Sequence, residues 1–286
     1  MNILSCFDGM SCGQLALRRA GISYDNYFSS EIDKYTVKVT QCNFPETVQL
    51  GDVQEVRPDK LPKIELLMGG SPCQGFSFAG KMLNFDDPRS RLFFEFDRLK
   101  NELNPKYFLL ENVRMKKESQ DIISEYLGVE PVFINSSLVS AQNRQRLYWT
   151  NIPFIIPEDK RIVLSDILES EVDAKYFAGE KLQKNYIGGN QLNPNYKSQA
   201  NTIHCLKDKF GTLCAGTHGY ANGYVNNNGF RKLTPIECER LQTVPDGYTN
   251  YVSDTQRYKM LGNGWTVDVV KEIFKGIANA MAKQWS

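Results

Sequence analysis

Histidine, long apolar runs and an excess of one charge are scarce or absent in this sequence of 286 residues. His204 and His218 are the only two histidines, so we expect no chemistry that needs several imidazoles. No apolar run approaches the roughly 18 residues of a membrane span, and the first ten residues, MNILSCFDGM, lack the basic segment of a signal peptide. A membrane partner is therefore not expected, and the formal net charge of +1 by itself identifies no partner.

Cysteine is present in an odd number without regular spacing, which argues against a disulfide framework and for the reducing cytoplasm. The cluster His204, Cys205, Cys214 and His218 matches no standard zinc spacing, so we expect no metal. The cysteine that stands out is Cys73, in the segment GGSPCQGFSFAG (residues 69–80), where a proline and several glycines surround the thiol. A buried structural thiol would not need these glycines.

The first half of the chain alternates between strand and helix patterns. Strands are predicted at NILSCF, YDNYFSSEI, ETVQLGDV, IELLMGG, KYFLLENV and VEPVFINSSLVS, and helices at GQLALRRAG and at about 33–42 and 88–104. Such alternation predicts an α/β fold with a mostly parallel sheet and helices on both faces. In that fold, ligands bind at the carboxyl ends of the strands.

The character of the sequence changes after residues 153–157. Residues 158–232 are polar and rich in Asn, Gly, Lys and Tyr, which predicts a smaller, loop-rich domain. Helical periodicity then returns, and one apolar stripe predicts a C-terminal helix that packs on the first domain. This stripe consists of Val267, Val270, Ile273, Phe274, Ile277 and Met281.

The first three strand ends favour an adenosine-type cofactor. FDGMSCG places glycines at a strand-to-helix turn, where a ligand can approach the backbone. Glu31 follows the second strand and Asp52 follows the third. The position of Glu31 is where nucleotide-binding folds have a carboxylate that binds the ribose. The turn lacks the GxGxxG pattern of dinucleotide sites.

The next strand ends carry reactive groups. Cys73 follows the fourth strand and Glu111 the fifth, while Arg144 and Arg146 are two residues apart and share one side if that segment is extended. Each residue alone would fit an ordinary loop or surface position. Together, a thiol, an acid and two guanidinium groups form a reactive constellation.

The motifs SPCQGFS, ENV, QNRQR and RKLTPIECERLQTVP…LGNGWTV occur in the order found in DNA (cytosine-5) methyltransferases. The chain resembles that family from residue 3 to about 275, apart from the variable region 158–230. RLFFEF, VSAQNRQRLYWTNIP and GNGW are similar to the vertebrate de novo enzymes. The sequence departs from the common pattern in FDGMSCG, where many members have a further glycine, and in Trp265, where bacterial members usually have a small residue.

This resemblance implies a Rossmann-like S-adenosylmethionine-dependent methyltransferase sheet with a smaller, loop-rich target recognition domain. Residues 1–157, completed by 254–286, would form the catalytic and cofactor-binding domain. Residues 158–232 would form the target recognition domain, and 233–253 a hinge segment.

The resemblance also implies the chemistry. Cys73 would attack C6 of a cytosine, because a thiolate is nucleophilic enough near neutral pH and makes C5 reactive toward a methyl sulfonium. Glu111 would act as the acid at N3, Arg146 would hold O2, and Arg144 would support Arg146. The base would be flipped out of the duplex, and the loop at about 74–89 would close over it.

S-adenosylmethionine is the implied cofactor and S-adenosylhomocysteine its product. The residues expected to bind the cofactor are Phe7, Asp8, Gly9, Gly13, Glu31, Ile32, Asp52, Val53, Pro72, Asn263 and Trp265. Those expected to contact DNA are Gln74, Ser77, Arg89, Arg91 and Gln142.

Double-stranded DNA is the expected partner. The enzyme is expected to be a monomer in the cytoplasm of a bacterium or a phage-infected cell. The sequence does not decide whether a cognate restriction endonuclease is a second partner. The main alternative is a tRNA cytosine-5 methyltransferase, although that branch typically has a motif like PCQPFT. A catalytically silent DNA-binding relative would usually lack the cysteine, the acid or the arginines. An NAD-dependent dehydrogenase would need the glycine fingerprint that is missing here.

Overall fold

The structure is a computed structural model that describes residues 1–71, 88–179, 203–216, 224–226 and 230–283. Its internal contacts divide the chain into two compact units. The first comprises residues 1–134, 145–156 and 270–286, and the second comprises 135–144 and 157–269. Contact density does not assign a function to either unit, so the predicted catalytic, recognition and hinge segments stay predictions.

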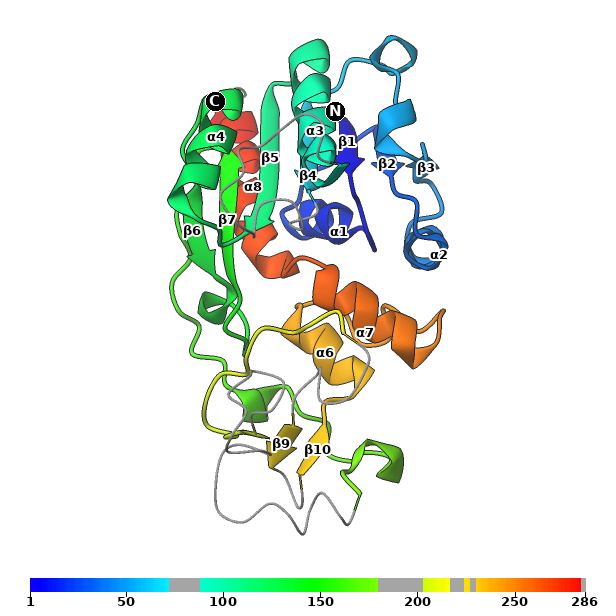
Figure 1. Ribbon diagram of the computed structural model, residues 1–286, viewed down its shortest axis with the longest axis vertical. Coiled ribbons are helices and arrows are strands. Elements are labelled where there is room, and N and C mark those ends of the chain that lie inside the picture. Colours follow the sequence, from blue (N-terminus) through cyan, green and yellow to red (C-terminus); the bar gives the residue numbers. More distant parts are fainter. Residues whose placement is uncertain (72–87, 180–202, 217–223, 227–229, 284–286) are drawn as a thin grey trace. The chain divides into compact units, whose positions relative to one another are not determined.

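Among the described residues, one sheet of seven strands is found, with the order β3-β2-β1-β4-β5-β7-β6 (Figure 1). The strands β1 to β5 pair in parallel, and β7 runs antiparallel to β5. The mostly parallel sheet is therefore as predicted. The strands are β1 (Asn2–Cys6), β2 (Asn26–Ser30), β3 (Val48–Gln49), β4 (Leu66–Gly70), β5 (Tyr107–Val113), β6 (Val132–Asn135) and β7 (Gln145–Thr150).

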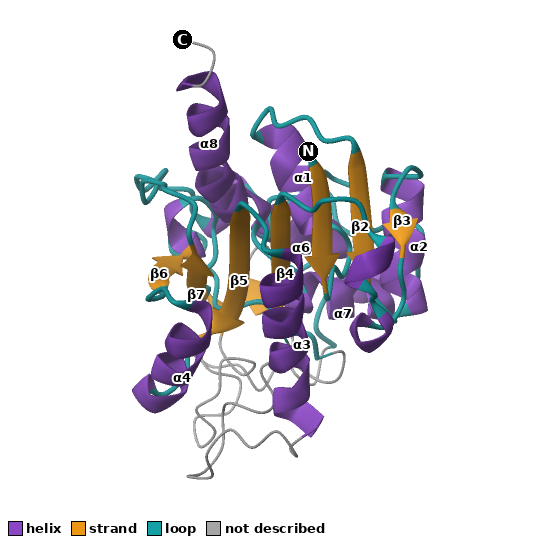
Figure 2. Cartoon of the chain, turned by 90° about the horizontal axis from the view of Figure 1, so that it is seen from above, coloured by secondary structure: helices purple, strands orange, loops and turns teal. Residues whose placement is uncertain are grey.

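Helices cover both faces of this sheet, as the alternation predicted. Figure 2 shows α3 (Pro88–Leu103) and α4 (Lys117–Leu127) on one face, and α1 (Cys12–Arg19) and α8 (Val267–Lys283) on the other. Helix α2 is Lys34–Asn43, and short 3-10 turns lie at Val53–Glu55, Pro58–Lys60 and Ser136–Leu138. Helix α4, which was not predicted, ends at Gly128, where φ is 73° and a glycine adopts the left-handed conformation without strain.

The core between α3 and the sheet follows the predicted apolar face of that helix. Phe93, Phe96 and Leu99 are completely buried, and Leu92 and Leu103 pack against them at its margin. Gly69 makes this close approach feasible, because a Cβ there would lie 3.1 Å from the Phe96 ring and 3.0 Å from the Cys6 carbonyl oxygen. One glycine before Cys73 is thus explained by packing.

The C-terminal helix packs on the first unit, as predicted. Val270, Ile273, Phe274 and Ile277 are completely buried, and a Cβ on Gly276 would lie 1.9 Å from the carbonyl oxygen of Pro153. Met281 corrects the prediction: its side chain is 38% exposed, because the last turn of the helix lies beyond the buried part.

The second unit is rich in loops. A small sheet of the order β10-β9-β8 is formed by β8 (Ile203–His204), β9 (Tyr224–Asn226) and β10 (Phe230–Lys232). Two helices, α6 (Pro235–Leu241) and α7 (Asp254–Asn263), and 3-10 turns at Leu164–Asp166 and Ala174–Tyr176 complete its described part. Thr234 and Glu237 form a reciprocal capping box at the start of α6. No helix in the described ranges combines the length and apolar character needed to cross a membrane.

Candidate active site

The turn between β1 and α1 has an unusual backbone. Phe7, Gly9 and Ser11 all have positive φ angles, of 56°, 59° and 58°. The amide of Gly9 donates a hydrogen bond of 2.8 Å to the carboxylate of Glu31, which joins this turn to the end of β2. Gly13 is buried in the first turn of α1. The first two predicted cofactor elements are therefore in direct contact.

Asp8 lies differently from the other residues of the turn. It is 9% exposed, and its carboxylate accepts hydrogen bonds from the hydroxyls of Ser11, Tyr27 and Ser29. Burial raises its pKa from the ordinary value of an aspartate, and these hydroxyls oppose that effect. The expected direct contact of Asp8 with a cofactor does not fit this inward orientation.

The other two strand ends expose the groups expected to meet an adenosine. Glu31 also accepts hydrogen bonds of 2.8 Å from the amides of Ile32 and Asp33. The Ile32 side chain is 76% exposed, which is unusual for an apolar residue directly after a buried strand. Asp52 caps the 3-10 turn that follows it by accepting from the amide of Gln54, and Val53 beneath it is buried.

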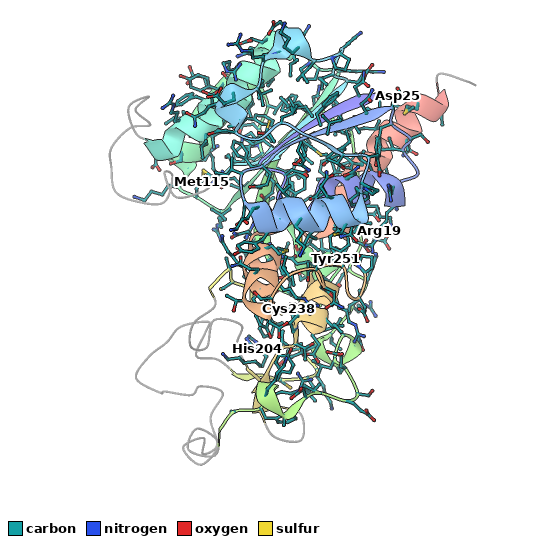
Figure 3. All side chains as sticks on the ribbon, turned by 90° about the vertical axis from the view of Figure 1, so that its right-hand side faces the viewer. Arg19, Asp25, Met115, His204, Cys238 and Tyr251 are labelled. Carbon is teal, nitrogen blue, oxygen red and sulfur yellow. The ribbon has the colours of Figure 1, made fainter. Side chains whose placement is uncertain are left out.

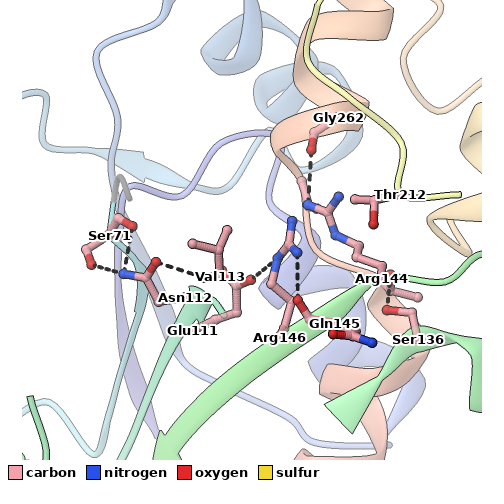
Figure 4. A network of polar contacts seen from close by, with 12 residues as sticks. Ser71, Glu111, Asn112, Val113, Ser136, Arg144, Gln145, Arg146, Thr212 and Gly262 are labelled. Carbon is pink, nitrogen blue, oxygen red and sulfur yellow. Dashed lines mark hydrogen bonds and ion pairs between the residues drawn. The ribbon is translucent and has the colours of Figure 1, made fainter. Parts of the chain in front are cut away.

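An ion pair lies at the end of β5. The Nε atom of Arg146 is 2.8 Å from Oε1 of Glu111, and the two side chains are 13% and 10% exposed (Figure 4). The register of β5 and β7 places Glu111 opposite Tyr148 and Val113 opposite Arg146, so the acid and the base are diagonal neighbours on one face. The sheet thus brings together two of the four predicted catalytic residues.

The neighbouring Asn112 connects this strand to the exit of β4. Its side-chain amide donates to the carbonyl oxygen of Ser71 at 3.3 Å and to the hydroxyl of Ser71 at 3.0 Å (Figure 4). Asn112 is 1% exposed and Ser71 is 5% exposed. Since Ser71 is two residues before Cys73, Asn112 fixes the start of the predicted nucleophile loop. No role was predicted for Asn112, although its place in the ENV motif was a signal.

The described part of the chain does not include residues 72–87. Four predicted site residues lie in this range: Pro72, Cys73, Gln74 and Ser77. The side chain of Arg89 also lies outside the described part, whereas Arg91 is exposed on α3. A DNA contact of Arg91 stays a prediction.

Arg144 and Arg146 act on different groups. The guanidinium of Arg144 is buried and donates to the carbonyl oxygens of Leu213, Gly262 and Gly264 at 3.2, 3.0 and 2.9 Å. Residue 144 precedes β7, which begins at Gln145, so the extended alternation expected for this pair does not include it. Within the second unit, Arg144 holds the segment that leads to Trp265.

Gln142 corrects the prediction of a DNA contact. It is completely buried, its amide nitrogen donates to the carbonyl oxygen of Leu241 and the side chain of Gln242, and its oxygen accepts from the amide of Leu213. A polar side chain in a polar stretch of sequence was expected at the surface, but here it satisfies buried backbone groups. Asn263 is exposed at the end of α7, and Trp265 is half-buried.

No group of three His, Cys, Asp or Glu side chains within the described ranges is placed to hold a metal ion. His204, which is considered for zinc and is labelled in Figure 3, packs its ring against Phe210 at a centroid distance of 4.3 Å. Burial lowers the pKa of His204 to about 4. His218 lies outside the described residues.

The comparisons with known proteins agree with this arrangement. The family model for C-5 cytosine-specific DNA methylases matches residues 1–152 and 116–279. The chain belongs to this family.

Several curated relatives are similar over most of the chain. Type II methyltransferase M1.ScrFI of Lactococcus lactis subsp. cremoris is 32% identical over 90% of this chain and 72% of its own length. M.NgoBI of Neisseria gonorrhoeae is 31% identical over 94% of this chain and 90% of its own length.

Solved structures show the same fold. The S. pombe Dnmt2 methyltransferase has a TM-score of 0.77 at 19% identity, with 98% of this chain and 99% of that chain covered. The Entamoeba histolytica methyltransferase EhMeth has a TM-score of 0.76 at 17% identity, with 98% of both chains covered. The predictions of the family, of the Rossmann-like methyltransferase fold and of cytosine-5 DNA methylation as the activity are confirmed.

Proposed function

We propose that this protein transfers a methyl group from S-adenosylmethionine to C5 of a cytosine flipped out of double-stranded DNA, through a covalent bond between Cys73 and C6. The observation that carries the proposal is the nearly buried ion pair of Glu111 and Arg146. Glu111 is paired with Gly70 across neighbouring strands, and Asn112 donates a hydrogen bond to Ser71. Glu111 and Asn112 therefore lie beside the chain segment that leads into Cys73.

The Cys73 thiol would make C5 of the cytosine reactive. C5 of cytosine is a weak nucleophile, and addition of the Cys73 thiolate to C6 turns C5 into an enamine-like carbon that attacks a methyl sulfonium. When a water molecule then takes the C5 proton, the C–H electron pair re-forms the double bond between C5 and C6, the bond between sulfur and C6 breaks, and Cys73 leaves as a thiolate. Cys73 is regenerated for the next cycle.

The ion pair stabilises the charge that this addition places on the ring. Glu111 would act as the acid at N3 when the thiolate adds, and Arg146 would donate to O2. Both groups are nearly buried before the substrate arrives, so little water has to be displaced from them when the base enters. Their diagonal placement on adjacent strands holds them without reliance on a loop.

The residues at the first three strand ends fit the cofactor. When bound, S-adenosylmethionine supplies the methyl group from its sulfonium. Glu31 would bind the ribose hydroxyls, the exposed Ile32 side chain offers an apolar surface to the adenine, and Asp52 would accept from the adenine amine. Phe7, Gly9, Gly13 and Val53 would complete this site, and the cofactor contacts of Pro72, Asn263 and Trp265 stay predictions from the sequence.

Arg144 has a supporting role in this proposal. It holds the carbonyl oxygens on both sides of Asn263 and so fixes the segment that ends in Trp265. Gly262 is needed there, because a Cβ would lie 2.2 Å from the amide nitrogen of Ala215.

Residues 158–232 would read the DNA sequence, in a monomer that works in the cytoplasm. The relatives named type II methyltransferases favour a cognate restriction endonuclease as a second partner.

Methyl incorporation tests the proposal. The purified protein is incubated with labelled S-adenosylmethionine and, separately, duplex DNA and tRNA, and the DNA product is sequenced after bisulfite treatment. We expect label in duplex DNA at C5 of cytosine in one fixed sequence context. Incorporation into tRNA alone would contradict the proposal, as would methylated DNA in which the mark lies on another base.

A further inference from the structure

The β1–α1 turn contains a carboxylate, that of Asp8, which is buried and turned toward hydroxyl groups of the protein. Asp8 receives hydroxyl hydrogen bonds from three elements: β1 through Ser5, β2 through Tyr27 and Ser29, and the N-cap of α1 through Ser11. Tyr27 donates to Oδ1 at 2.7 Å, and Ser29 donates to Oδ2 at 3.0 Å. The carboxylate is thus the shared acceptor of a buried hydroxyl cluster.

Ser11 shows what this cluster does. Its φ of 58° and ψ of 41° lie in the left-handed region, which a residue other than glycine rarely adopts. The serine at the start of a helix commonly uses its hydroxyl to cap the helix, but Ser11 makes no such bond and donates to Oδ2 of Asp8 instead. Ser11 is completely buried, so its hydroxyl does not reach a bound ligand.

The backbone of the same turn is held at both sides of Asp8. The amide of Asp8 donates to the carbonyl oxygen of Ser30 at 3.2 Å, and the amide of Ser11 donates to the carbonyl oxygen of Asp8 at 3.1 Å. Gly9, between them, presents its amide to Glu31. A change in the conformation of Ser11 would therefore move the groups that the proposed cofactor site uses.

We propose that Asp8 is a positioning residue, which locks Ser11 in the left-handed conformation and thereby shapes the S-adenosylmethionine turn without touching the cofactor. This inference rests on the proposed function. It differs from the sequence-based expectation that Asp8 contacts the cofactor directly.

The distinction predicts a specific rescue. Replacing Asp8 with alanine removes the acceptor that compensates for the conformation of Ser11, so affinity for S-adenosylhomocysteine should fall about tenfold or more. Glycine adopts positive φ without a side-chain anchor, so Ser11→Gly in the Asp8→Ala background should restore affinity to within about threefold of the wild type. A direct contact of Asp8 with the cofactor would not be restored in this way.

A second pair of variants keeps Asp8 in place. Ser11→Gly and Ser11→Ala both lose the hydroxyl, but only alanine is disfavoured at positive φ. We expect Ser11→Gly to bind like the wild type and Ser11→Ala to bind about tenfold more weakly. This pair tests the inference even where Asp8→Ala fails to fold.

The matched control is Thr47→Ala. Thr47 is also buried in the first unit and donates its hydroxyl to a buried side chain, Gln14, at 2.8 Å, but it does not contact Asp8. Its loss should lower the melting temperature without changing the affinity.

Calorimetric titration of the full chain with S-adenosylhomocysteine decides the matter, with the melting temperature of each variant measured alongside. Unchanged affinity in Asp8→Ala, or equal affinities in Ser11→Gly and Ser11→Ala, would overturn the inference. A loss in Asp8→Ala that Ser11→Gly does not restore would also overturn it. If the wild type itself binds neither S-adenosylhomocysteine nor S-adenosylmethionine, the proposed function has failed instead.

Discussion

The ion pair between Glu111 and Arg146 makes a quantitative prediction about stability. Replacing Arg146 with methionine keeps much of the side-chain volume but removes the charge that faces Glu111. Breaking a buried pair in this way costs about 3–5 kcal/mol, because the remaining carboxylate keeps its desolvation penalty. The side chains here are 10% and 13% exposed, so partial contact with water places the expected loss near the lower limit, at about 3 kcal/mol.

Removing both charges should cost less than removing one. Glu111→Gln combined with Arg146→Met leaves no uncompensated charge, so we expect the double variant to be more stable than Arg146→Met alone by about 1–2 kcal/mol. Urea unfolding followed by circular dichroism gives the free energy of unfolding of the wild type, the two single variants and the double variant, which together form a double-mutant cycle. All three variants should methylate DNA more slowly than the wild type, because each lacks a group that stabilises the charged ring.

Arg114→Met is the matched control. Arg114 is exposed on the neighbouring chain segment, and its guanidinium donates to the side chain of Gln145 at 3.4 Å. Its loss should change the free energy of unfolding by less than about 0.5 kcal/mol. Strictly additive effects of Glu111→Gln and Arg146→Met would refute the reasoning, because uncoupled residues cannot share the stabilisation of one charge.

Three further predictions concern the turns and the cofactor residues. Gly262→Ala should destabilise the protein by more than about 2 kcal/mol in urea unfolding, because its Cβ would lie 2.2 Å from a backbone nitrogen; wild-type stability would contradict the packing at this position. Glu31→Ala should weaken S-adenosylhomocysteine binding by about 1.5–3 kcal/mol in calorimetry, since both the ribose partner and the anchor of Gly9 are lost; an unchanged affinity would remove Glu31 from the site. Burial raises the pKa of Asp8, so protonation of Asp8 stabilises the folded state relative to the unfolded state. This contribution to the free energy of unfolding is present at acid pH and is lost as the pH rises through the folded-state pKa. The free energy of unfolding of the wild type relative to Asp8→Asn should therefore increase as the pH is lowered from neutral through the folded-state pKa of Asp8. Cys6 and Tyr27 stay protonated over this range because their pKa values are also raised, and a constant difference would contradict the burial of the charge.

The strand ends could be predicted from sequence because each buried strand is a short apolar run that stops at a glycine or a charged residue. The positions of Glu31, Asp52 and Glu111 follow from that pattern together with the rule that parallel strands end at one edge. The pairing of Glu111 with Arg146 needed the antiparallel register of β5 and β7, which no local pattern contains.

The burial of Gln142, Arg144 and Asp8 could not be predicted from the sequence, and the three cases have a common physical origin. Gln142 and Arg144 are polar residues in a polar stretch, and such residues are usually exposed. Here both are buried because they satisfy backbone carbonyl oxygens from residues 69 to 120 positions away in the chain. The inward orientation of Asp8 was missed for the same reason, since its hydroxyl partners come from β1, β2 and the start of α1.

The covalent bond between Cys73 and C6 is the central claim, and a fluorinated substrate tests it most directly. In a duplex with 5-fluorocytosine at the target position, methyl transfer leaves fluorine on C5, which cannot leave as a cation, so elimination is blocked and the enzyme stays joined to the DNA. We expect the wild type with S-adenosylmethionine to give a denaturant-resistant complex on a gel. Cys73→Ala should give none while still binding duplex DNA, and Glu111→Gln should form the complex about 10²–10⁴-fold more slowly. A denaturant-resistant complex formed by Cys73→Ala would contradict the account, because another residue would then be the nucleophile.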